Sequence, residues 1–409
     1  MDILVQKFGG TSVKNKETRK SAIKHIHAAK REGYKIICVV SAIGRSPDPY
    51  ATDSLLGLVD HPNSHISARE HDLLLSCGEI ISAIVFSNEL KTSGLKSTAL
   101  TGAQAGFVTT EDHGCAKIKA MEVERLLDEL FVNDVVVVAG FQGQTIDGET
   151  TTLGRGGSDT SAAALGAAVD AKFIDIFTDV EGIMTADPRV VKEAQLLDVV
   201  TYNEICNLAY QGAKVIHPRA VEIAMQAKIP LRVRSTEQDH VGTLVTSSVA
   251  EVKGKEIPDR LITGIAHMAG ITQVRIAATD QADVLHAGVF KAMAEAGISV
   301  DFINIFPNDV VYTIPEVYSE KAAQLLNELG YQPKFNHDCA KVSIVGAGMT
   351  GVPGVTAKIV DSLTNRGIQI LQSADSHTTI WVLIHNKDLV PAINALHDAF
   401  QLNNQMTRI

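Results

Sequence analysis

Short apolar runs alternate with longer amphipathic segments through roughly the first 245 residues. The runs at 35–41 and 173–179 contain few polar positions, which is typical of strands covered on both faces. Further strands are predicted at 3–8, 95–100, 135–138 and 230–234, and helices at about 16–32 and 65–93. This order predicts a doubly wound, mostly parallel α/β sheet.

The remaining sequence repeats itself at an offset of 70 residues. The matched pairs are Val289 and Ile359, Phe290 and Val360, Met293 and Leu363, Gly297 and Gly367, and Ile298 and Ile368. Each copy reads as strand, helix, strand, strand, helix, which predicts two ferredoxin-like α+β modules. Since residues 235–260 are polar and irregular, we expect a first domain at 1–245, a linker at 246–262, and modules at 263–337 and 338–409.

Composition narrows the class of protein. The chain has 409 residues and a net charge of −10, and no Lys/Arg cluster offsets that charge, so we expect no nucleic-acid partner. Five scattered cysteines without a CxxC pair indicate reduced, mostly buried thiols of a cytoplasmic protein, and no metal site. No signal peptide precedes the first strand, and no apolar run approaches the roughly 20 residues of a membrane span.

A glycine-rich stretch at 151–164 leads into a predicted helix. Its glycines are Gly154, Gly156 and Gly157, and its N-cap residue types are Ser158, Asp159 and Thr160. A glycine loop before a helix N-terminus suits an anion, and Arg155 adds a fork for a carboxylate or phosphate. A tight loop into an ordinary capped helix explains the same residues.

Lys7 ends the first predicted strand and is followed by Gly9 and Gly10. Ligands of doubly wound sheets bind beyond the carboxyl ends of strands, so Lys7 is placed to act as a point charge on a phosphate. The alternative is a surface lysine beside a turn. The stretch matches neither the Walker A motif nor the GxGxxG dinucleotide fingerprint.

The ordered motifs of the chain resemble those of aspartate kinases. They are Lys7–Ser12, Ser41–Gly44, Cys77–Glu79, Ala139–Gly143, Thr152–Asp159, Thr178–Gly182, Ala186–Arg189 and Gly212–Pro218. The second half resembles the paired ACT modules of the same enzymes, so the resemblance spans nearly the whole chain. It implies the amino-acid kinase fold and transfer of the γ-phosphoryl group of ATP to the β-carboxylate of L-aspartate. The product, 4-phospho-L-aspartate, begins the routes to lysine and diaminopimelate, threonine and methionine.

The resemblance also implies roles for individual residues. The reacting centre is formed by Lys7, Gly10 and Asp159. L-Aspartate is held by Ser41, Thr52, Glu79 (at the α-ammonium), Arg155 (at the α-carboxylate), Gly156 and Ser158. ATP is held by Lys7, Phe8, Gly9, Gly10, Thr178, Asp179, Met184, Asp187, Arg189, Lys214 and Val215, with Mg²⁺ bridging its phosphates. Because the attacking carboxylate is ionised at pH 7, catalysis needs positioning and charge neutralisation, not a general base.

Simpler interpretations exist for several of these residues. Glu79 could be an exposed helix acid, Asp159 an N-cap, and Asp187-Pro188 turn chemistry. His217 precedes a helix, and we expect it to have a packing or capping role, not a catalytic one.

The chain departs from the family pattern at two positions in its first half. The loop at 45–51 is longer than usual, which affects the assignment of Thr52. Met184 stands where many relatives carry an aromatic residue, although a methionine can still pack on a base.

ACT modules imply feedback by an end product, namely lysine, threonine or meso-diaminopimelate, in a homo-oligomer that pairs through these modules. Here residues 280–284 lack the Pro-Gly found at 353–354, and Phe306 replaces an effector-contacting Asn of some relatives. We therefore expect an effector site of altered specificity. Modules that only dimerise are the alternative.

Three other functions compete with this one. Residues 345–351 spell GxGxxG, with Asp375 at the ribose position, but a single short repeat follows and not a second βαβ unit. Another amino-acid kinase, acting on glutamate, carbamate or a nucleotide, leaves Glu79 and the paired modules unexplained. A non-catalytic amino-acid sensor predicts loss of Lys7, Arg155 or Asp159, and all three are present.

Overall fold

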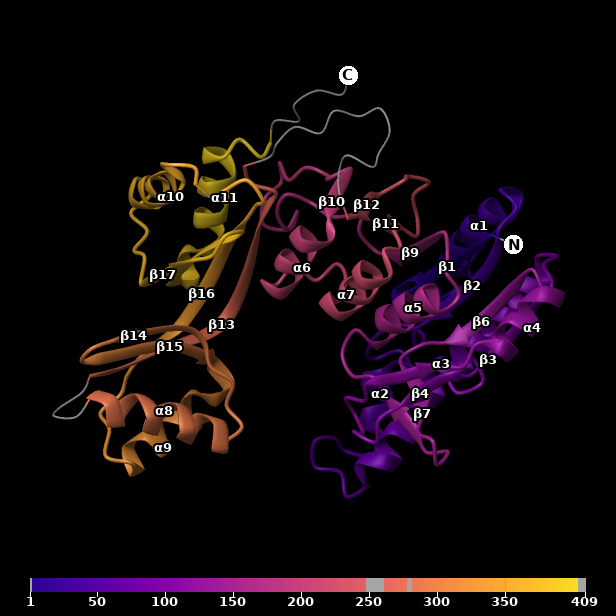
Figure 1. The fold of residues 1–409 in the computed structure, drawn as a ribbon, viewed down its shortest axis with the longest axis horizontal. Coiled ribbons are helices and arrows are strands. Elements are labelled where there is room, and N and C mark those ends of the chain that lie inside the picture. Colours follow the sequence, from indigo (N-terminus) through magenta and orange to yellow (C-terminus); the bar gives the residue numbers. More distant parts are fainter. Residues whose placement is uncertain (1, 248–260, 278–281, 350, 404–409) are drawn as a thin grey trace. The chain divides into compact units, whose positions relative to one another are not determined.

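The computed structural model describes residues 2–247, 261–277, 282–349 and 351–403. The chain divides into two compact units (Figure 1). Unit 1 comprises Met1–Ile183, Leu196–Ala209 and Lys214–Ile257, and unit 2 comprises Met184–Gln195, Tyr210–Ala213 and Pro258–Ile409. Two short segments from within the predicted first domain, residues 1–245, therefore belong to unit 2.

Unit 1 is built on an eight-stranded sheet of order β10-β12-β11-β9-β1-β2-β6-β3. Its strands are β1 (Ile3–Phe8), β2 (Lys35–Val40), β3 (Ser97–Leu100), β6 (Val135–Ala139), β9 (Phe173–Thr178), β10 (Val199–Thr201), β11 (Leu231–Ser235) and β12 (Thr243–Thr246). Every neighbouring pair is parallel except β11 and β12. The predicted mostly parallel sheet is confirmed.

The strand predicted at 230–234 is present as β11, but the prediction that it is the last strand and is followed by irregular chain was wrong. β12 returns antiparallel to β11. The return requires Gly242, whose φ is +73° and where a Cβ atom would lie 1.9 Å from the carbonyl oxygen of Val233. The sequence signal was weak because β12 has four residues flanked by polar chain.

Helices cover both faces of this sheet. They are α1 (Lys16–Arg31), α2 (Thr52–Gly57), α3 (Ala68–Thr92), α4 (Glu124–Val132), α5 (Gly157–Ala168), α6 (Tyr202–Tyr210) and α7 (Pro218–Ala227). α1 and α3 share a core with Phe177 of β9. Ile174 and Phe177 lie on opposite faces of β9. α5 contacts the face of Ile174, since a Cβ at Gly166 of α5 would lie 2.5 Å from Cδ1 of Ile174. α5 therefore packs on the opposite face of the sheet from α1 and α3.

A smaller sheet of order β5-β4-β7-β8 was not predicted. Its strands are β4 (Phe107–Thr109), β5 (Ile118–Met121), β7 (Gln142–Gln144) and β8 (Thr150–Thr152). Runs of three or four residues carry too little periodicity to be recognised. The sheet matters because β8 leads directly into the glycine-rich stretch.

α3 is long and apolar enough, by length and composition alone, to cross a membrane. Half of its most apolar window is buried in unit 1, where Ala83, Phe86 and Leu90 join the core. The same helix buries the carboxyl groups of Asp72 and Glu79. α3 is therefore a core helix. The expectation that no apolar run approaches the length of a membrane span was wrong for this helix.

Unit 2 contains a six-stranded sheet of order β14-β15-β13-β16-β18-β17, antiparallel throughout. Its strands are β13 (Gly264–Ala277), β14 (Asp301–Phe306), β15 (Asp309–Pro315), β16 (Lys334–Val345), β17 (Gln372–Asp375) and β18 (Thr379–His385). Its helices are α8 (Ala282–Glu295), α9 (Ser319–Glu328), α10 (Val355–Thr364) and α11 (Leu389–Ala399).

Two ferredoxin-like modules share the long strands β13 and β16. α8 and α9 pack beside β14 and β15, and α10 and α11 beside β16 to β18 (Figure 1). The repeat at an offset of 70 residues is confirmed, because Val289 and Met293 are core residues of one module and Ile359 and Leu363 of the other. A parallel dinucleotide-binding unit at 345–351 is excluded, since β16 pairs only with antiparallel strands.

The segment Met184–Gln195 packs into the second module. Ala186 and Val191 lie in its core. Thr185 Oγ1 lies 3.0 Å from Nε2 of the fully buried His397, and the amide of Asn394 donates to the carbonyl oxygen of Val190 at 3.2 Å. The second module thus holds a segment that was predicted from the sequence to lie beside the nucleotide.

We predict that Asp175→Ala lowers the free energy of unfolding by about 3 kcal/mol, because a buried ion pair loses one partner. Asp175 is fully buried and accepts hydrogen bonds from Arg232 at 2.6 and 3.0 Å and from Gln6 at 3.3 Å, its neighbours across the sheet. Urea unfolding measures the loss. Glu149→Ala is the control: it breaks an exposed pair with Arg69 and should cost less than about 1 kcal/mol. Equal losses would contradict the prediction.

Candidate active site

The first strand and the glycine-rich stretch meet in an ion pair. Nζ of Lys7 lies 2.7 Å from Oδ1 of Asp159, and both side chains are 13% exposed. Asp159 sits in the first turn of α5, where the backbone N–H of His217 donates to its other oxygen at 3.2 Å. A Cβ at Gly9 would lie 3.6 Å from Nζ of Lys7, so the loop after β1 borders the ammonium group. The two motifs that the sequence singled out are thus one site.

Gly156 sets the shape of the glycine-rich loop. It is the N-cap of α5 with φ +67°, so Ser158, Asp159 and Thr160 lie inside the helix and the interpretation of them as caps was wrong. A Cβ at Gly156 would lie 2.1 Å from Cγ of His217, so the imidazole packs directly on the loop.

The side chains around this loop differ in exposure. The Arg155 side chain is exposed, and Ser158 is buried. A Cβ at Gly140 would lie 3.1 Å from the Ser158 hydroxyl oxygen, so the ends of β6 and α5 are in contact.

The loops after β1 and β2 also touch. A Cβ at Gly10 would lie 2.6 Å from the carbonyl oxygen of Gly44, and the N–H of Gly44 donates to the carbonyl oxygen of Gly10 at 3.0 Å. Ser41 follows β2 and is half-buried. The long loop at 45–51 is folded by a hydrogen bond from the Arg45 N–H to Asp48, which leaves Thr52 half-buried at the first position of α2.

Glu79 lies inside unit 1, so its interpretation as an exposed helix acid is wrong. It is 2% exposed, and Oε1 accepts the N–H of Ala42 at 3.0 Å. Oε2 is buried and has no hydrogen-bond partner among the described residues. Burial raises the pKa of Glu79 to about 8, and the hydrogen bond from Ala42 opposes the shift. A buried carboxyl group with an empty acceptor is suited to a cationic ligand.

The residues predicted to bind nucleotide divide between the units. Unit 1 contains Lys7, Phe8, Gly9, Gly10, Thr178, Asp179, Lys214 and Val215, whereas unit 2 contains Met184, Asp187 and Arg189. Phe8 is fully buried and stacks on Phe177 with 4.7 Å between ring centroids, so only its main chain can contact a ligand.

Two pairs of charged side chains accompany these residues. Within unit 1, Asp179 pairs with Arg45 at 3.5 Å. Within unit 2, Arg189 donates to Asp187 at 2.7 Å and lowers the pKa of that carboxyl group.

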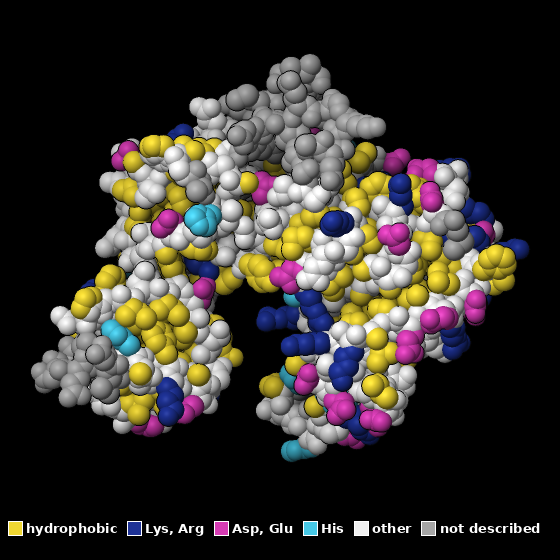
Figure 2. All heavy atoms as spheres, viewed as in Figure 1, with side chains coloured by type: hydrophobic (Ala, Val, Ile, Leu, Met, Phe, Trp, Pro, Cys, Tyr) yellow, Lys and Arg dark blue, Asp and Glu magenta, His cyan; other side chains and the backbone are white. Residues whose placement is uncertain are grey.

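Charged side chains gather around the described part of the site. Across residues 2–247, 261–277, 282–349 and 351–403, no group of three or more His, Cys, Asp or Glu side chains could hold a metal ion. Lys and Arg side chains gather on unit 1 next to α7 and the loops beside it (Figure 2). The cysteines were predicted to be mostly buried, but Cys77 and Cys115 are exposed.

Three residues next to the glycine-rich loop were given no role in the reaction from the sequence, although packing or capping was expected of His217. They are Asp72, which is fully buried and accepts from Thr152; His217, which packs on Gly156; and Arg219, which donates to the carbonyl oxygens of Leu153 and Ala116. Asp72 could have been found, because it lies seven residues before Glu79 on one helix face.

The fold is that of a known family of phosphotransferases. Residues 2–235 match the Amino acid kinase family, and residues 334–398 match the ACT domain. Aspartokinase 1 of Bacillus subtilis (strain 168) is 62% identical over 403 residues, which cover 98% of this chain and 100% of the relative. Aspartokinase of Geobacillus stearothermophilus is 39% identical over 415 residues and the full length of both chains.

Solved structures agree with these relatives. Escherichia coli aspartokinase III with aspartate and ADP has a TM-score of 0.78 at 25% identity, covering 97% of this chain and 99% of its own. Its complex with lysine and aspartate has a TM-score of 0.76 at 25% identity, covering 98% and 100%. The chain therefore belongs to the aspartokinases.

As an aspartate kinase, the protein transfers the γ-phosphoryl group of ATP to the β-carboxylate of L-aspartate, and its ACT modules make it an allosteric enzyme. The alternatives of a kinase for another amino acid and of a non-catalytic sensor are excluded by full-length identity to aspartokinases.

The titration of Glu79 generates a prediction about stability. Its pKa is about 8 in the folded state against an ordinary 4.5, so the folded protein holds a proton that the unfolded chain releases. The stabilisation is complete below pH 4.5 and is lost as pH rises towards 8. Glu79→Gln should therefore become more stable than wild type as pH rises from 5 to 8, by on the order of 3 kcal/mol.

Urea unfolding at a series of pH values measures this difference. Glu70→Gln is the control: hydrogen bonds from Ser67 lower the pKa of the exposed Glu70 on the same helix, so its difference from wild type should stay nearly constant from pH 5 to 8 and change only at lower pH. A difference between Glu79→Gln and wild type that stays constant from pH 5 to 8 would show that Glu79 is ionised throughout.

Proposed function

We propose that Lys7, Gly10 and Asp159 form the reacting centre of this aspartate kinase. The observation that carries the proposal is the 2.7 Å pair between Lys7 and Asp159, mostly buried at the carboxyl end of β1. Lys7 supplies positive charge to the transferring phosphoryl group, and Asp159 holds the ammonium in place. Gly10 keeps the loops after β1 and β2 in contact, which a side chain would prevent.

The proposed step is an in-line displacement. A β-carboxylate oxygen of L-aspartate forms a bond to the γ-phosphorus while the bond from that phosphorus to the β–γ bridging oxygen breaks, and ADP leaves with the electron pair. No proton is removed from the nucleophile. Lys7 and the free N–H groups at the start of α5 lower the repulsion between the two anions.

The two groups on the α-carbon of L-aspartate are held by residues of opposite charge. Glu79 takes the α-ammonium at its unpartnered Oε2, and Arg155 takes the α-carboxylate as a bidentate fork. The ammonium stabilises the ionised form of Glu79, so substrate binding releases its proton. The site is completed by Ser41, Thr52, Gly156 and Ser158.

In unit 1, the main chain of Phe8 and Gly9 and the side chain of Lys7 meet the phosphates of ATP, and Thr178, Asp179, Lys214 and Val215 extend the site. The family resemblance assigns Met184, Asp187 and Arg189 to the nucleotide as well. Mg²⁺ fits a site without a protein cluster, because it retains waters and is held chiefly by substrate phosphates. When bound, it neutralises phosphate charge.

Lys7→Ala is expected to lower kcat by about a hundredfold to a thousandfold and to raise the KM for aspartate much less, because Lys7 acts on charge in the transition state. The assay contains ATP, Mg²⁺ and L-aspartate and traps the acyl phosphate with hydroxylamine. Lys16→Ala, at an exposed lysine of α1, should match wild type. Equal losses in kcat and in aspartate binding would contradict the assigned role.

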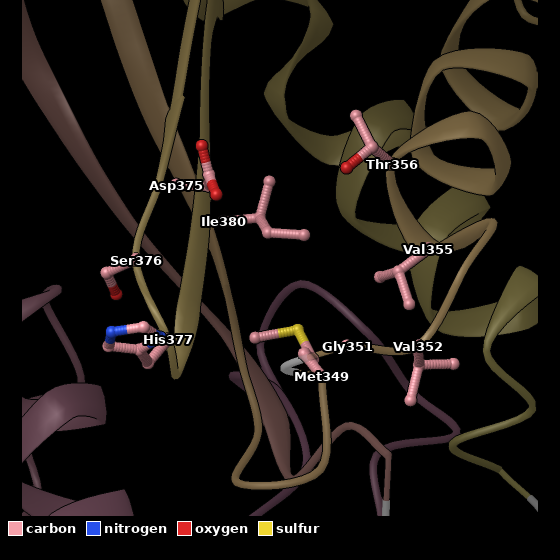
Figure 3. A pocket seen from close by; sticks show the side chains of 9 residues that line it. All are labelled: Met349, Gly351, Val352, Val355, Thr356, Asp375, Ser376, His377 and Ile380. Carbon is pink, nitrogen blue, oxygen red and sulfur yellow. The ribbon is translucent and has the colours of Figure 1, made fainter.

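We also propose that the second ACT module binds the amino-acid effector: lysine, threonine or meso-diaminopimelate. A pocket of about 510 Å³ lies between the turn after β17 and the start of α10 (Figure 3). Asp375, Ser376 and His377 line one side, and Val355 and Thr356 the other. The carboxylate suits an ammonium group, and the start of α10 suits a carboxylate.

Asp280 and Gln281 of the first module lie outside the described residues. Phe306 is 49% exposed on the edge strand β14, beside the exposed Ile305. An edge with exposed apolar side chains supports the proposed pairing of ACT modules in a homo-oligomer. A cytoplasmic location is likewise part of the proposal.

Asp375→Asn should raise the concentration of effector that gives half-inhibition at least tenfold, because the ammonium loses its charged partner. Each of the three amino acids is titrated in the hydroxamate assay. Asp361→Asn, on the exposed side of α10, should leave half-inhibition unchanged. An unchanged response in Asp375→Asn would place the effector elsewhere.

A further inference from the structure

Asp72 is a fully buried carboxylate that the proposed reaction does not use. Oδ1 accepts the Thr152 hydroxyl at 2.6 Å and the Gly114 N–H at 3.0 Å. Oδ2 accepts the backbone N–H of Thr152 at 2.9 Å and lies 3.0 Å from Nδ1 of His113. Every described partner is a neutral N–H, a hydroxyl or an imidazole, so the carboxylate is held by directed hydrogen bonds.

The place of Asp72 in the fold links the two groups that hold L-aspartate. Asp72 and Glu79 are seven residues apart on α3, which puts them on one face about 10 Å apart along the axis. The chain that Asp72 binds is β8, whose last residue, Thr152, lies three positions before Arg155. One side chain thus connects the helix of Glu79 to the strand that leads to Arg155.

The segment between Thr152 and Arg155 is short and firmly held. The N–H of Leu153 donates to the carbonyl oxygen of Phe141 at 2.8 Å, and Arg219 donates to the carbonyl oxygen of Leu153 at 3.2 Å. The N–H of Gly157 then donates to the carbonyl oxygen of Gly154 at 3.0 Å, closing the turn that displays Arg155. A displacement of the Thr152 backbone would therefore also displace Arg155.

We propose that Asp72 is a positioning residue of the aspartate site, which fixes the separation between Glu79 and Arg155 without touching the substrate. The inference rests on the roles proposed above for those two residues. The α-ammonium and α-carboxylate of L-aspartate are attached to one carbon atom, so their spacing is fixed and the two contacts tolerate little change in the separation between Glu79 and Arg155. The nucleotide residues after β9 do not depend on this link.

Asparagine in place of Asp72 would present an NH₂ group to partners that are themselves donors. Asp72→Asn should therefore raise the KM for L-aspartate at least tenfold and leave the KM for ATP within twofold. Thr152→Val removes only the hydroxyl bond and should raise the KM for aspartate about threefold. The double variant should not exceed Asp72→Asn by the full threefold, because both changes break one connection.

Thr151→Val is the matched control on the same strand. The Thr151 hydroxyl is buried against that of Thr109 at 2.6 Å, on the opposite face of β8 from Thr152. Thr151→Val removes the same chemical group as Thr152→Val and should lower thermal stability by a comparable amount, but it should leave the KM for aspartate unchanged. If Asp72→Asn fails to fold, the comparison of Thr152→Val with Thr151→Val decides the question.

Glu79→Gln and Arg155→Lys separate this inference from the proposed function. If both raise the KM for aspartate, and Asp72→Asn and Thr152→Val raise it without affecting the KM for ATP, the positioning role stands. If both raise it and the Asp72 and Thr152 variants do not, the positioning role is overturned alone. If neither raises it, the assigned substrate contacts fail and the inference fails with them. Equal effects of Thr151→Val and Thr152→Val would also overturn it, as general loosening of β8.

Discussion

The repulsion between two anions is the constraint on which this structure depends. A phosphate and a carboxylate must be brought into contact, and in the proposed reacting centre Lys7 lies one residue before the end of β1, next to the start of α5. The 2.7 Å pair with Asp159 holds the lysine at the sheet edge, and the glycines on either side keep side chains out of the space around it. Apolar burial explains the sheet, but this pair explains why its carboxyl edge carries the chemistry.

The proposed contact with the α-ammonium of the substrate follows from the interior of unit 1. Glu79 is buried on a core helix with one oxygen unpartnered, an arrangement that is costly until a cation arrives. Such a group makes binding selective, because a ligand without an ammonium cannot restore its charge. The apolar composition of α3 places the helix in the core. Burial in that core raises the pKa of Glu79 and leaves one of its oxygens without a partner.

The parts of the molecule that could be predicted from the sequence are those with strong hydrophobic periodicity or distinctive sequence motifs. The long strands, α1, α3 and the repeat of the two modules were recognised, and so was the meeting of Lys7 with the glycine-rich stretch. The strands β4, β5, β7 and β8 were missed because three or four residues carry little period. Asp72 was missed because its partner Thr152 lies 80 residues away in the chain, and only its spacing from Glu79 along α3 pointed to it. His217 was expected to pack or cap, but its partner Asp159, 58 residues away, is not encoded by any local pattern. The packing of Met184–Gln195 into the second module is of the same kind.

A crystal structure with L-aspartate and ADP tests the central claim most directly. The account predicts the α-ammonium at Oε2 of Glu79, the α-carboxylate on Arg155, and the β-carboxylate directed towards Lys7 and the phosphates. It also predicts that Lys7 keeps its contact with Asp159. L-Aspartate bound with its α-carboxylate towards Lys7, or with Glu79 left without a cationic partner, would contradict the account.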